Sequence, residues 1–84
     1  MNEPGDWKDV KYNEVFEQEL VGIERRRNTD SGCTVNDLEK VLEHLYIMDG
    51  ADWIGRGEVQ DIVMSATIAA YELFIAKWKA EQEV

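Results

Sequence analysis

The sequence predicts an all-α fold, an up-down-up bundle of three helices in which the C-terminal helix is the longest. Three observations support this. Residues 59–78 have an apolar majority and no glycine or proline, and two earlier stretches repeat apolar residues every three or four positions. The connections between the stretches are rich in glycine and polar turn residues. A length of 84 residues with 44% hydrophobic content predicts one domain, residues 1–84.

The first helix is expected near residues 7–27, with Asp6 suited to cap its start. Its apolar face is formed by Tyr12, Val15, Phe16, Leu20 and Ile23. Gly22 weakens this helix by about 1 kcal/mol relative to alanine, or marks the close approach of another helix. The three arginines at 25–27 complement the negative end of the helix dipole, or form a small basic site for an acidic partner.

The second helix is expected near residues 35–49. Thr34 is followed three positions later by Asp37, which is the spacing of a capping box at a helix start. One face is continuously apolar, and consists of Val35, Leu38, Val41, Leu42, Leu45 and Met48. His44 lies beside that face and is expected to be exposed. The pattern predicts a helix that packs through one side only.

The third helix is expected near residues 58–82 and is apolar over most of its circumference. A stripe with alternating spacings of four and three is formed by Ile62, Ala66, Ala69, Leu73 and Ala76, with further apolar rows on both sides. Such a helix must be covered on several sides, so we expect it to be the spine of the bundle. We do not expect a membrane span, because Asp61 and Lys77 enclose only 15 residues, fewer than the roughly 18 that spanning requires.

The third helix is also longer than the second, at about 37 Å against about 22 Å. If the two are antiparallel and start level, the second cannot reach the C-terminal part of the third. That part carries Tyr71, Phe74, Ile75 and Trp78. We therefore expect these side chains to be covered by the first helix, or by a second copy of the chain in a homodimer.

The loop between the second and third helices contains Trp53 and Arg56 among three glycines. Tryptophan and arginine are frequent in binding hot spots, so this loop is a candidate contact surface. The alternative is that Trp53 and Ile54 close the open end of the bundle. The candidate interaction residues are therefore Trp53, Arg56, Tyr71, Phe74, Ile75 and Trp78.

The charge pattern and the chemistry of single residues narrow the function. Eighteen acidic residues against nine basic ones give a net charge of −9, which disfavours direct binding to nucleic acid or anionic membranes. The single cysteine excludes an internal disulfide, and the N-terminal residues lack an export signal pattern, so we expect a cytoplasmic location. No spacing suits a metal site, a cofactor or a nucleophile with its base, so we expect no metal, no cofactor and no catalytic activity.

These observations predict a small acidic intracellular helical module for protein–protein interaction or regulation, with an unidentified protein as its partner. The alternative function is an acidic mimic of nucleic acid, or an inhibitor, that binds a basic protein through its carboxylates. An enzyme or metal protein is a third class, for which the sequence offers no sufficient set of residues.

Overall fold

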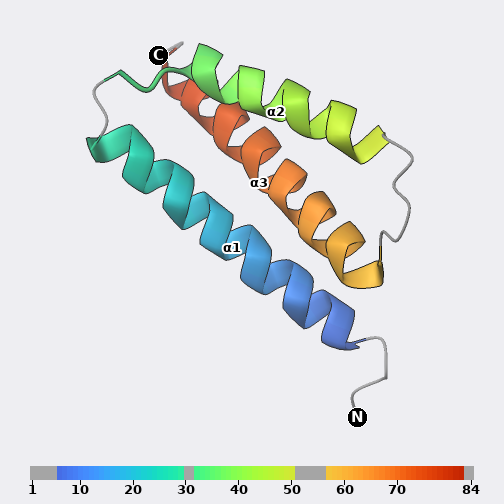
Figure 1. Ribbon diagram of the computed structural model, residues 1–84. Coiled ribbons are helices and arrows are strands. Elements are labelled where there is room, and N and C mark those ends of the chain that lie inside the picture. Colours follow the sequence, from blue (N-terminus) through green and yellow to red (C-terminus); the bar gives the residue numbers. More distant parts are fainter. Residues whose placement is uncertain (1–5, 30–31, 51–56, 83–84) are drawn as a thin grey trace.

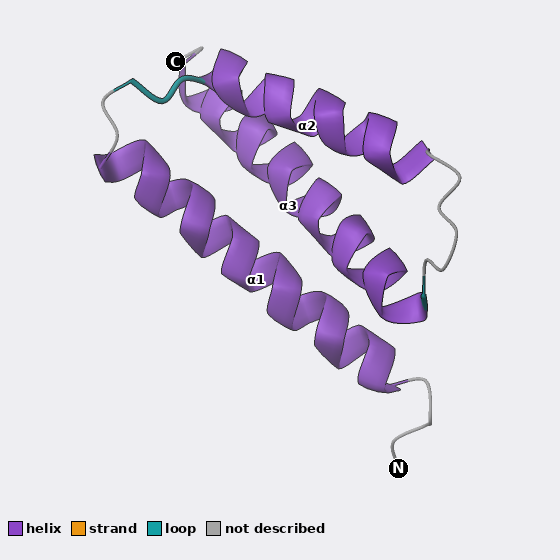
Figure 2. Cartoon of the chain, in the orientation of Figure 1, coloured by secondary structure: helices purple, strands orange, loops and turns teal. Residues whose placement is uncertain are grey.

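The computed structural model describes residues 6–29, 32–50 and 57–82, and nearly all of them are helical (Figure 2). The helices are α1 (Asp6–Thr29), α2 (Val35–Gly50) and α3 (Glu58–Gln82). Helices α1 and α3 run in one direction and α2 runs in the other (Figure 1). The prediction of an all-α three-helix bundle is confirmed, and the expected helix boundaries agree with the structure to within two residues.

Local hydrogen bonds explain where α2 and α3 begin. At α2 the Asp37 N–H donates to Thr34 Oγ1 at 3.2 Å, and the Thr34 N–H donates to Asp37 Oδ2 at 3.0 Å. This is the predicted capping box, which satisfies two backbone donors that the helix itself leaves unpaired. At α3 the Gly57 N–H donates to Gln60 Oε1 at 2.9 Å, a cap that the sequence pattern did not reveal.

The bundle is open. Helices α1 and α2 each pack against α3, but no Cα atom in the described part of α1 lies within 8 Å of a Cα atom of α2. The third helix is therefore the spine of the fold, as its apolar circumference predicted. The radius of gyration is 14.6 Å, whereas a compact domain of this length has one of about 12 Å.

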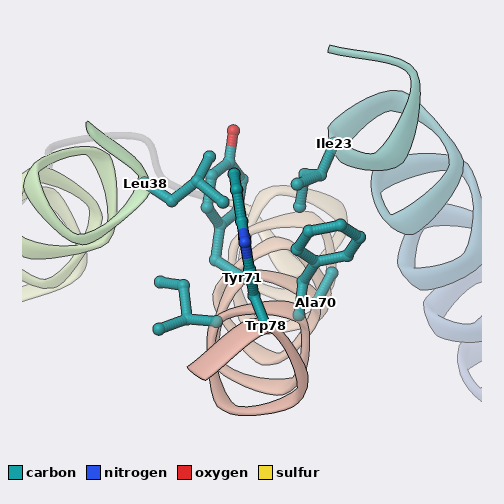
Figure 3. Close-up of a cluster of buried hydrophobic side chains, with 7 residues drawn as sticks. Ile23, Leu38, Ala70, Tyr71 and Trp78 are labelled. Atoms are coloured by element: carbon teal, nitrogen blue, oxygen red, sulfur yellow. The ribbon is translucent and has the colours of Figure 1, made fainter. Parts of the chain in front are cut away.

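The core lies where α1 ends, α2 begins and α3 ends. Its buried side chains are Ile23, Leu38, Ala70, Tyr71, Phe74, Ile75 and Trp78. Ile23 on α1 and Leu38 on α2 point toward the aromatic side chains of α3 from opposite sides (Figure 3). One end of the molecule thus holds most of the large buried side chains.

The position of α2 along α3 differs from the expectation. The ion pair between Glu39 and Lys79, at 2.5 Å, places the first turns of α2 beside the last turns of α3. The assumption that the two helices start level was therefore wrong, because α2 is shifted toward the C-terminal end of α3. The aromatic side chains there are covered by α1 and α2 of the same chain.

The stripe expected to be central on α3 is only partly buried. Ala66 is fully buried, but Leu73 is 43% exposed and Ala76 is exposed. The buried side of α3 is instead formed by the neighbouring rows that contain Tyr71 and Phe74, whose larger side chains remove more apolar surface from water.

Gly22 does not mark a close helix contact. A Cβ atom added there would have no heavy atom within 4 Å, and the residue is exposed. Gly22 is therefore only a weak helical position.

Candidate interaction surface

Four of the six predicted interaction residues belong to the core. Tyr71, Phe74, Ile75 and Trp78 are between 6% and 9% exposed. These side chains hold the three helices together, and so they do not offer a surface to another molecule. Trp53 and Arg56 lie outside the described residues, so their role in binding stays a prediction.

Contacts with its neighbours fix the orientation of Trp78. The Phe74 ring meets it edge to face with centroids 6.0 Å apart, and the Arg27 guanidinium lies 4.6 Å from the Trp78 ring centroid. Arg27 also donates to Glu81 Oε1 at 2.7 Å, and this hydrogen bond lowers the pKa of the Glu81 carboxyl. Arg27 thus links α1 to the last turns of α3 by charge and by a cation–π contact.

The opposite end of the molecule is less closely packed. From the core end toward their connection, α2 and α3 diverge (Figure 1). Along the apolar face of α2, side-chain exposure follows this divergence: Leu38 is fully buried, Leu45 is half-buried, and Met48 is 39% exposed. The C-terminal half of α2 therefore leaves part of α3 uncovered.

An apolar groove occupies this uncovered region. It is lined by Leu45 of α2 and by Val59, Gln60, Val63, Met64 and Thr67 of α3, and it encloses about 370 Å³. We call these six residues the α2–α3 groove. Val59 is 49% exposed and Val63 is 36% exposed, which is unusual for neighbouring valines on the central helix of a bundle.

The two polar residues of the groove each make one local hydrogen bond. The Thr67 hydroxyl donates to the Val63 carbonyl at 2.8 Å, and Gln60 Oε1 accepts from the Gly57 N–H. These bonds leave a lining that favours apolar side chains over polar ligands. A shallower hollow shares Leu45 and extends the apolar surface along α2, where it is lined by Lys40, Val41, His44, Leu45 and Met48.

Exposed polar contacts position the helices around this open end. The Tyr46 hydroxyl of α2 donates to the Glu72 carboxylate of α3, and this hydrogen bond raises the pKa of the Tyr46 phenol. Lys8 of α1 pairs with Glu58 of α3 at 2.5 Å. Because exposed ion pairs contribute little stability, the open end is held less firmly than the core end.

The described residues do not bring together a recognisable catalytic or metal-binding set. Within residues 6–29, 32–50 and 57–82, no group of three or more His, Cys, Asp or Glu side chains is placed to hold a metal ion. His44 is exposed and Cys33 is partly buried. Glu72 is exposed.

By length and composition alone, α3 is apolar enough to cross a membrane. Core helices of bundles pass the same test, and here α3 packs between α1 and α2.

In comparisons with models of protein families, with curated proteins and with solved structures, the chain has no significant match.

Proposed function

We propose that this protein is a small acidic module for protein–protein interaction or regulation, without catalytic activity, that acts in the cytoplasm. The observation that carries the proposal is the α2–α3 groove. It exposes Val59 and Val63 on the helix that otherwise forms the core. Hydrophobic grooves between helices are recurrent sites of recognition between proteins.

The test is affinity purification with three versions of the full chain. The groove variant carries Val59→Gln and Val63→Gln, and the control variant carries Val10→Gln and Val21→Gln. The control residues are exposed valines on α1, at 55% and 56%, so both variants replace two helical valines without changing the charge.

We expect quantitative mass spectrometry to find a protein that the wild type and the control retain and the groove variant loses. The three chains must first show equal helical content by circular dichroism. If the groove variant retains every protein in the same amount as the control variant does, the α2–α3 groove is not the binding site and this part of the proposed function is wrong.

The alternative function, an acidic mimic or inhibitor of a basic protein, is favoured by the charge distribution. None of the described charged side chains is buried, and the net charge is −9. A complex held by these carboxylates would weaken steeply with salt and would be indifferent to the groove substitutions. A groove-dependent complex that persists at high salt would favour the first proposal over this one.

A further inference from the structure

We infer that the α2–α3 groove binds an amphipathic helix of another protein, whose flanks are basic. This inference rests on the proposed function and adds the chemistry of the partner.

The lining of the groove suits a helix. Val59, Val63 and Thr67 are spaced four residues apart along α3, and Gln60 and Met64 form a parallel row beside them. Rows with this spacing are the ridges that interdigitate when two α-helices pack. From Val59 to Thr67 the row is about 12 Å long, which corresponds to a little over two turns of a partner helix.

The required partner surface follows from the lining. Because the groove lining is mostly apolar, the partner should present apolar side chains at intervals of three and four residues. Met64 lines the groove and Met48 lines the adjoining hollow, and their flexible side chains fit apolar groups of different shapes.

Charge selects between a second copy of the chain and a different protein. Residues 35–50 and 57–67 form the groove and its surroundings, and they contain six carboxylates and one lysine. Two of these carboxylates, Glu39 and Glu58, pair with Lys79 and Lys8, so among the described residues three lysines stand against these six carboxylates. A second copy would bring the same excess of negative charge to the interface, on a chain whose net charge is already −9. Basic residues beside the apolar row of a partner helix would instead be attracted.

The experiment uses three synthetic peptides of about 18 residues, which is about five helical turns. The first places leucine on one face of a helix and lysine elsewhere. The second has the same composition in an order that forms no apolar face, and the third replaces every lysine of the first by glutamate. Binding of each fluorescent peptide to the wild type, the groove variant and the α1 control variant is measured by anisotropy.

We expect the leucine–lysine peptide to bind the wild type and the control equally, and the groove variant at least about tenfold more weakly. The reordered peptide and the glutamate peptide should each bind the wild type at least about tenfold more weakly than the first. If the reordered peptide binds the wild type as tightly as the first peptide does, charge alone attracts the peptides to the chain, and the inference is overturned. If the glutamate peptide binds the wild type as tightly as the first peptide does, the claim that the partner helix has basic flanks is overturned.

Three further outcomes relate this inference to the proposed function. If a groove-dependent protein is found but the leucine–lysine peptide does not bind, the function stands and the partner chemistry is wrong. If light scattering shows a wild-type dimer that the groove variant abolishes, a second copy occupies the groove and the inference is overturned. If neither a protein nor a peptide depends on the groove, both proposals fail.

Discussion

Replacing Leu38 by alanine tests whether α2 is attached to the bundle mainly at its N-terminal half. The Leu38 side chain is fully buried in the core, where it lies beside the aromatic residues of α3 (Figure 3). Substitutions of this kind cost about 3–5 kcal/mol, because they lose apolar transfer energy and leave a cavity. A chain of 84 residues has a total stability of about 4–13 kcal/mol, so the loss is a large fraction of it.

The matched control is Ile47→Ala. Both substitutions shorten an aliphatic side chain on α2 to alanine, but Ile47 is 65% exposed and should cost no more than about 0.5 kcal/mol. Urea unfolding followed by far-ultraviolet circular dichroism measures both free energies. In thermal unfolding, a loss of about 3 kcal/mol corresponds to a midpoint lower by roughly 12–24 °C.

A cost below about 1 kcal/mol for Leu38→Ala would mean that α2 does not dock through this side chain. An equal cost for Ile47→Ala would mean that the side of α2 opposite Leu38 is also packed, although Ile47 is 65% exposed in the structure.

Three other predictions test local features. Gly22→Ala should raise the free energy of unfolding by about 0.5–1 kcal/mol, since the added methyl group meets no neighbour; destabilisation in urea unfolding would show a hidden contact. Thr34→Ala should lower it by about 0.5–2 kcal/mol through loss of the α2 cap, and an unchanged midpoint would contradict the capping box. The Tyr46 phenol should titrate above its ordinary pKa of 10.0, because it donates to Glu72 in the folded state. The folded chain holds this proton more tightly than the unfolded chain, so the stabilisation is complete below about pH 10 and is lost as the pH rises through the raised pKa. Near-ultraviolet absorbance of the wild type and of Tyr46→Phe measures this titration, and Glu72→Gln should lower the Tyr46 pKa; an unchanged pKa would exclude the hydrogen bond as its cause.

Much of the secondary structure follows from short-range patterns. The start of α2 is specified by Thr34 and Asp37, because a capping box needs only residues that are three apart. The buried face of α2 is equally local, since Leu38 lies in its single apolar row. The residue ranges of all three helices could therefore be predicted from the sequence without knowing which elements pack against them.

The burial of α3 could not be predicted in this way. Its apolar residues surround most of the helix, so periodicity alone does not decide which row faces the neighbours. The alternating stripe suggested Leu73 as a central residue, but it is 43% exposed. Tyr71 and Phe74 are buried in its place, because packing α1 and α2 around the largest side chains removes more apolar surface from water.

The candidate site depends entirely on tertiary arrangement. Val59 and Val63 belong to one of the apolar rows beside the alternating stripe, and an excess of apolar rows is the available signal that two neighbours cannot cover the whole helix. Whether such a row is buried depends on how far α2 is shifted along α3 and on the angle between them. Both are set mainly by the packing of Leu38 in the core, which acts between residues far apart in the chain, and the exposed Glu39–Lys79 pair is consistent with the resulting register.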